Sequence, residues 1–382
     1  EIYMGDWSSD VCSSDLTAVR VCSSTPAGID DGNCVSYGSY SKPEGSIQRN
    51  ARTKRFGAIS YSTDGSNTRD GGVLRSNMKY VGPTLPDGTT NSVAEFRTDG
   101  TLVNNPDGAT GGLNSGVINY INKFSDAAYK SLDPVSELFY ESIRYFKNLG
   151  PTPEYSAGLT TAQLGGFQIV NSWSDPQQYK CQKNFIIAIN DANPWLDKRL
   201  PGTFFTSSTI SGASGTVTLD GNDYGEPSNA DPAINVRDLT NRVGALEGLH
   251  SLWSDSGTWV STGAKGSISG ANDSVGGGSG TFDNGCGSKT VTALGEVMGT
   301  CPYAPKQNSY YVAGLAYYAN TTDLRSDFDN DRGIQNVQTF MIDTQEFSTN
   351  PLDGPKNMLW LTGKYGGFNY MEIGRASCRE RV

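Results

Sequence analysis

Residues 184–191 read NFIIAIND, a short apolar run in which Ile186, Ile187 and Ile189 are β-branched. Apolar side chains fall on both sides of the pleat, so neither side suits water. This pattern is typical of a central strand in a parallel sheet that is covered on both faces. The run therefore predicts an α/β fold in which helices flank a mainly parallel sheet.

The clearest helix signal lies at 134–149, PVSELFYESIRYFKNL. Asp133 is a natural N-cap, Pro134 suits the first helical position, and Gly150 follows the end. Apolar residues recur on one helical face, namely Val135, Leu138, Phe139, Ile143 and Phe146. These signals agree, and they predict a helix with one core-facing side.

Weaker patterns supply the other elements. Strands are predicted at 55–62, 71–82 and 336–344, and helices at 116–124, 235–253, 309–325 and 355–368. Residues 201–305 are rich in Gly and Ser and are interpreted as a long insertion. The order of strands and helices favours a parallel sheet between helices.

Both ends resemble translated sequencing adapters rather than natural protein. Residues 6–16 read DWSSDVCSSDL and residues 372–382 read EIGRASCRERV. Segments of this origin carry no information about the natural fold of a protein. We therefore expect 1–16 and 370–382 to be artefacts, 17–369 to be the true region, and the chain to be a fragment without its signal peptide.

The net charge and the histidine content exclude several classes of function. Lys and Arg number 30 against 40 Asp and Glu, a formal net charge of -10, which argues against a nucleic-acid partner. His250 is the single histidine, so multi-histidine metal centres are excluded. Ser251 and Asp255 follow it closely, but such neighbours on one helix point apart and form no catalytic triad by themselves. No stretch is long enough to span a membrane.

Five segments in this order resemble a von Willebrand factor A-type domain. RFGAISYS is similar to an edge strand of that fold, SLDPVSELFYESIRYF to a helix that opens with Thr-Pro-Leu, NFIIAIND to a buried strand, and VQTFMIDT with LWLTGKYGGF to the late strand and last helix. The resemblance implies a Rossmann-like α/β sheet whose first strand is missing from this chain.

Five segments resemble the PilY-type (PilC-type) family of type IV pilus tip-associated adhesins and assembly factors. They read RFGAISYSTDGSNTRDGGVLRSNMKYVGP, DPVSELFYESIRYFKNLGPTPEY, CQKNFIIAIND, VAGLAYYANTTDLR and LWLTGKYGGF. The resemblance implies an exported, non-enzymatic protein of the cell surface, pilus tip or outer membrane. It implies roles in pilus assembly, retraction control and adhesion, with minor pilins and a host or abiotic surface as partners.

The von Willebrand resemblance also implies a metal site, because that fold holds a hard divalent cation on oxygen ligands. Asp133 takes the place of the ligating Thr, and Asp191 takes the place of the Asp after the buried strand. The Asp-x-Ser-x-Ser loop is absent. We therefore expect an incomplete, vestigial site with no tightly bound cofactor, and Mg²⁺ or Ca²⁺ only in the full-length protein. A role as N-cap is a sufficient and favoured explanation for Asp133, and a role as turn residue is a sufficient explanation for Asp191.

A second acidic group lies in SDFDNDRG, with Asp327, Asp329 and Asp331 at alternate positions. Closely spaced carboxylates can wrap calcium. The glycine comes one position late for a standard loop and no distant Glu is well placed, so a solvated acidic turn is favoured over a weak calcium loop.

Five cysteines remain once the adapter segments are set aside, and they suit an oxidising compartment. Cys22 with Cys34, and Cys286 with Cys301, are sequence-local candidates for disulfides, although five cysteines allow other pairings. Cys181 is left over, either for a partner outside this chain or as a buried thiol beside its strand.

Two other functions remain as alternatives to the pilus hypothesis. A secreted hydrolase with a carboxylate-based site is one, although the sequence has no nucleophile elbow. A surface-layer or stalk protein with a purely structural role is the other.

Overall fold

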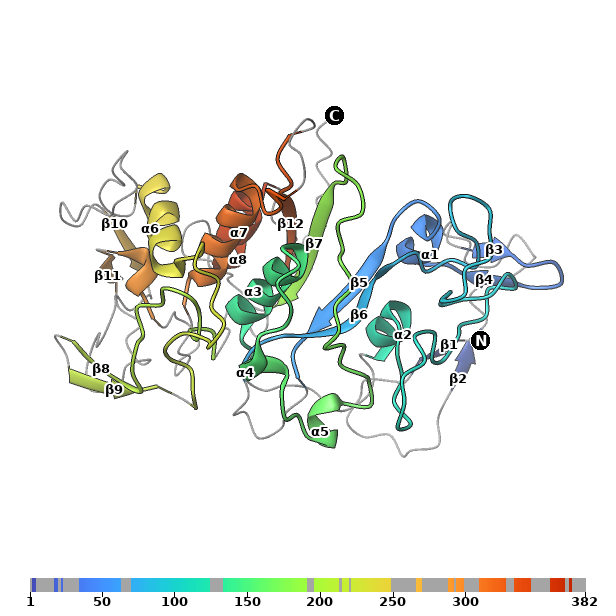
Figure 1. Ribbon diagram of the computed structural model, residues 1–382, viewed down its shortest axis with the longest axis horizontal. Coiled ribbons are helices and arrows are strands. Elements are labelled where there is room, and N and C mark those ends of the chain that lie inside the picture. Colours follow the sequence, from blue (N-terminus) through green and yellow to red (C-terminus); the bar gives the residue numbers. More distant parts are fainter. Residues whose placement is uncertain are drawn as a thin grey trace. The chain divides into compact units, whose positions relative to one another are not determined.

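A computed structural model describes the chain over the following ranges: 2–4, 17–19, 22, 34–62, 70–123, 133–190, 196–212, 215–219, 221–248, 266–269, 288–291, 293–298, 309–327, 333–344, 358–367 and 371–372. The fold is mixed α/β, with small sheets of which one is parallel (Figure 1). The chain divides into two compact units. Unit 1 comprises Glu1–Ala58, Arg75–Asp126 and Gly166–Gln168, and unit 2 comprises the rest.

A parallel sheet organises unit 2. Strand β7 (Asn184–Asn190) pairs in parallel with β12 (Val337–Asp343), and β13 (Met371–Glu372) joins the other side of β12 in the same direction. Helices α7 (Tyr311–Thr321) and α8 (Met358–Tyr365) contact β12, and α3 (Val135–Phe146) contacts α7. Figure 1 shows these helices gathered beside the β7–β12 pair. The predicted strands 184–191 and 336–344 and their parallel direction are confirmed.

The prediction that β7 is buried on both faces is wrong. Side chains of β12 alternate, with Val337 and Met341 fully buried on the helix side. On β7, Phe185, Ile187 and Ile189 are exposed. The run is apolar on both sides of the pleat, yet among the described residues only one side has a cover of helices.

Helix α3 confirms the helix predicted at 134–149, but burial of its polar face was not predicted. The helix begins with Pro134 as its N-cap, and no side chain caps it by a hydrogen bond, so Asp133 is not the N-cap. Its apolar face is buried as expected. Its polar face is buried too, including Glu137, Glu141 and Arg144.

Several further elements of unit 2 lie in the region predicted to be an insertion. Helix α6 (Val236–Leu246) packs on α7 and on the short 3-10 helix η2 (Leu294–Glu296). Val243 and Leu294 are fully buried, so this part of 201–305 contributes to the core. Two antiparallel hairpins also lie in this region: β8 (Thr209–Gly212) with β9 (Gly215–Thr218), and β10 (Gly266–Ser269) with β11 (Ser288–Val291). Two short helices of unit 2 lie before it: α4 (Pro153–Ser156) and α5 (Thr161–Leu164).

Unit 1 has a small core of its own, made by Ala51, Val81, Phe96 and Ile118. Helix α2, expected at 116–124, begins where the buried Glu95 accepts hydrogen bonds from two backbone N–H groups. The unit contains two antiparallel hairpins and two helices: β1 (Ile2–Met4) with β2 (Thr17–Val19), β3 (Cys34–Ser36) with β4 (Ser41–Pro43), α1 (Ser46–Asn50) and α2 (Val117–Asn122). Strands β5 (Phe56–Ser60) and β6 (Val73–Lys79) pair with each other where 55–62 and 71–82 were predicted.

Candidate functional site

Polar side chains meet where β7 ends, at the carboxyl edge of the parallel sheet. Asn190, the last residue of β7, donates a hydrogen bond from Nδ2 to Oδ2 of Asp133 at 3.2 Å. The hydroxyl of Tyr61 donates to Oδ1 of Asn190 at 2.9 Å. Asp133 and Asn190 are both buried. The amide of Asn190 therefore joins the start of α3 to the segment that follows β5.

Asp343 stands beside Asn190 at the same edge, because the two residues are register partners at the ends of β12 and β7. The backbone continues the pairing one step further, where Thr344 N–H donates to the carbonyl of Asn190 at 3.0 Å. Asp343 is almost completely buried. Sequence reasoning missed this carboxylate, although its place after the apolar strand VQTFMI was the signal that could have found it.

The edge was predicted to bring Asp133 and Asp191 together. Asp133 does lie there, in contact with the residue that precedes Asp191, while Asp191 itself lies outside the described residues. Within the described ranges no three acidic, thiol or imidazole side chains lie close enough to hold one metal ion. The described residues thus do not by themselves fit a divalent cation.

A second polar cluster surrounds Lys198, deep in unit 2. Its ammonium forms ion pairs with Asp223 and, at 3.9 Å, with Asp197, and all three side chains are fully buried. Asp197 also accepts hydrogen bonds from the Ser136 and Ser309 hydroxyls at 3.0 and 2.9 Å. Burial lowers the pKa of Lys198, but the two carboxylates outweigh it, so its pKa lies above the usual value. The cation remains charged and holds the carboxylates together.

Glu137 of α3 faces the same cluster. Its Oε1 accepts the Arg199 backbone N–H at 2.8 Å, while Oε2 is buried with no hydrogen-bond partner among the described residues. Burial raises the pKa of Glu137 well above its usual range, and the nearby charges of Asp70 and Asp223 add to the rise. The surroundings of Glu137 therefore favour its protonated form more than water does.

One turn further along α3, Glu141 anchors the segment before α4. Its two oxygens accept hydrogen bonds from the Thr152 backbone N–H at 3.0 Å and hydroxyl at 2.7 Å. Burial raises the pKa of Glu141 to about 7, against these hydrogen bonds. The buried polar face of α3 thus ties the helix to two loops rather than presenting a reactive group to solvent.

The predicted calcium loop is described only at its first member. Asp327 forms a bidentate ion pair with Arg325, with N–O distances of 2.9 and 2.8 Å. The same guanidinium also pairs with Asp175 at 2.6 and 2.9 Å. Asp329 and Asp331 lie outside the described residues. The structure therefore gives Asp327 a structural partner, and calcium binding by this loop stays a prediction.

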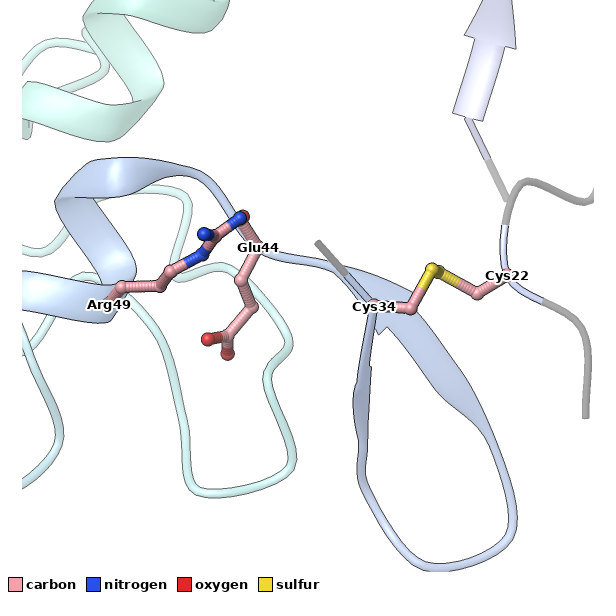
Figure 2. Close-up of a disulfide and its surroundings, with 4 residues drawn as sticks. All are labelled: Cys22, Cys34, Glu44 and Arg49. Carbon is pink, nitrogen blue, oxygen red and sulfur yellow. A yellow bond between two sulfur atoms is a disulfide. The ribbon is translucent and has the colours of Figure 1, made fainter. Parts of the chain in front are cut away.

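The structure joins Cys22 to Cys34 in a disulfide with a Cα–Cα distance of 5.8 Å. Figure 2 shows this bond tying the segment at Cys22 to strand β3. Cys181 has a free thiol and is exposed, so the alternative of a buried thiol is wrong. The other predicted positions, Cys286, Cys301 and His250, lie outside the described residues.

The sequence of this chain matches the family profile described as the PilY1 homolog, second domain, over residues 56–319. The chain belongs to that family. It is also 33% identical over 379 aligned residues to a type IV pilus biogenesis factor PilY1 homolog from Xylella fastidiosa strain Temecula1. That alignment covers 92% of this chain but only 26% of the relative.

The chain therefore spans about a quarter of the length of its Xylella relative. No solved structure matches it. Among the described residues of this PilY1-type chain, no helix combines the length and the apolar character needed to cross a bilayer. The predicted resemblance to the PilY-type family is confirmed.

Proposed function

We propose that this chain is a non-enzymatic part of a type IV pilus biogenesis factor that acts at the pilus tip. In this role it supports pilus assembly and retraction control and takes part in surface adhesion. Its partners are minor pilins of the tip and a host or abiotic surface, and its place is the cell surface, pilus tip or outer membrane. The match to the PilY1 homolog second domain carries the proposal.

The buried carboxylates support a structural role. Asp197 and Asp223 are held by Lys198, and Glu141 by Thr152. These carboxylates form their hydrogen bonds and ion pairs with neighbouring segments of the same unit. A carboxylate-dependent hydrolase needs an acid and a base that reach substrate.

The fold that we propose for unit 2 is von Willebrand factor A-like, completed by a first strand from outside the chain. The parallel pairing of β7 with β12 and the position of Asp133 at their carboxyl edge support it. In that fold, ligands gather at the carboxyl ends of the strands. Asp133 and Asp191 would then be remnants of a cation site.

Calorimetry tests this vestigial site directly. Two carboxylates leave most of a cation's coordination shell to water, so titration of the chain with Mg²⁺, Mn²⁺ or Ca²⁺ is expected to show no binding tighter than about millimolar. Micromolar binding that Asp191→Ala abolishes would show that the site is complete in this chain.

Immunogold labelling tests the place of action. Antibodies raised against this domain should label the ends of purified pili in an organism that produces the full-length protein. A strain in which the domain is deleted provides the background. Labelling confined to the cell interior, or to secreted material with hydrolytic activity, would contradict the proposed function.

A further inference from the structure

The outer face of the β7–β12 pair carries an apolar strip. On β7 the exposed fractions are 43% for Phe185, 68% for Ile187 and 54% for Ile189. Phe340 and Ile342 of β12 are half-buried on the same side of the sheet, and the rings of Phe185 and Phe340 lie 6.3 Å apart. These five side chains are called the outer strip below.

The outer strip is not built to face water. Parallel sheets are found almost only with both faces covered, and here the helices α7 and α8 lie on the opposite face. Exposed strands are normally protected by charged side chains or proline. Residues 184–190, NFIIAIN, contain neither. A strand of this composition is suited to a covered outer face.

The size of the outer strip argues against a second copy of the chain as that partner. The three exposed side chains of β7 offer on the order of 300 Å² of apolar surface, well below the ~800 Å² per partner of a stable interface. A segment of the same polypeptide needs far less contact area, because the covalent link keeps it at high effective concentration.

The family description indicates where such a segment can come from. The profile that matches this chain describes a second domain, so the family's proteins carry polypeptide before it. The chain spans 26% of its Xylella relative, which leaves ample length for a covering element. We propose that an amphipathic segment of the polypeptide preceding this second domain docks its apolar face on the outer strip.

Cysteine labelling tests this proposal. Ile187→Cys places a thiol on the most exposed position of the outer strip, where the small change leaves the core intact. The variant is made in this chain and in a longer protein that includes the polypeptide preceding the domain, both in a Cys181→Ser background. Labelling by a water-soluble maleimide is followed peptide by peptide. The introduced thiol should react at least tenfold more slowly in the longer protein.

Ile334→Cys is the matched control, because Ile334 is 52% exposed and lies just before β12, outside the outer strip. Its labelling rate should be equal in both proteins. Equal rates for Ile187→Cys in the two proteins would overturn the proposal. Protection that already exists in the short chain and grows with its concentration would also overturn it, because a second copy would then cover the strip.

Discussion

At the scale of single residues, the most consequential side chain is Lys198. It is fully buried between Asp197 and Asp223, and Glu137 lies close enough to influence its pKa. A buried ion pair adds little stability over an apolar core, but removal of one partner leaves an uncompensated charge. Lys198 therefore matters because, without it, the carboxylates of Asp197 and Asp223 would be buried without a cation.

Lys198→Met tests this dependence. The two carboxylates would stay buried with no cation, so we expect a loss of about 3–5 kcal/mol in the free energy of unfolding. Urea titration followed by circular dichroism measures it, with Lys183→Met at an exposed position as the control. Adding Asp223→Asn to Lys198→Met should restore part of the lost stability. A double variant that is no more stable than Lys198→Met alone would show that the ion pair is unimportant.

Glu141 makes stability depend on pH. Its pKa in the folded state is about 7, above the ordinary 4.5, so the folded state favours the neutral acid. The resulting stabilisation is complete below about pH 4.5 and is lost as the pH rises through 7.

Glu141→Gln keeps the shape of the side chain and removes the ionisation. We expect the variant to match the wild type at pH 4.5 and to exceed it by up to roughly 3 kcal/mol at pH 8. Urea unfolding at the two pH values measures the difference, with Glu226→Gln, an exposed carboxylate, as the control. A variant equally destabilised at both pH values would contradict the raised pKa.

At the scale of elements, α6 and α7 pack with almost no space between their backbones. A Cβ added at Gly314 of α7 would lie 2.4 Å from the Thr240 hydroxyl oxygen and 2.7 Å from its backbone nitrogen. The backbone atom cannot move aside as a side chain could. Glycine is therefore needed at this position despite its low helix propensity.

Gly314→Ala should lower the free energy of unfolding by about 1–2 kcal/mol, because overpacking outweighs the gain in helix propensity of about 1 kcal/mol. Thermal unfolding measures it. Thr321→Ala, at the exposed end of the same helix, should change the melting temperature far less. Stabilisation by Gly314→Ala would show that α6 and α7 are not in close contact.

Local patterns predicted the elements well because their signals lie within a few turns of chain. The 3.6-residue spacing of Val135, Phe139 and Ile143 was enough to place α3. The surroundings of each face depend on distant residues. Periodicity could not show that Glu137 would be buried against Arg199, or that Ile187 would face outward.

The candidate site, too, was predicted only in part from the sequence. The position of Asp133 near the end of β7 followed from the rule that ligands gather at the carboxyl edge of a parallel sheet. Its contact with Asn190, rather than a role as N-cap, depends on how α3 meets β7 in space. The cluster around Lys198 escaped prediction because its members come from separate segments with no shared motif.

At the scale of the whole molecule, family membership carries the functional account. The chain matches a PilY1 homolog domain over residues 56–319 and spans about a quarter of a type IV pilus biogenesis factor. Among the described residues, the most extensive polar contacts are buried, around Lys198 and along α3.

Replacement of the matching region in the Xylella relative by residues 17–369 of this chain tests the account most directly. The measurement is the number of surface pili per cell, counted by electron microscopy in a strain that lacks the relative and carries the chimera. We expect the chimera to restore pili above the deletion strain, while the same chimera with Lys198→Met fails to do so. An exported, folded chimera that leaves the cells as bare as the deletion strain would contradict a role in pilus biogenesis.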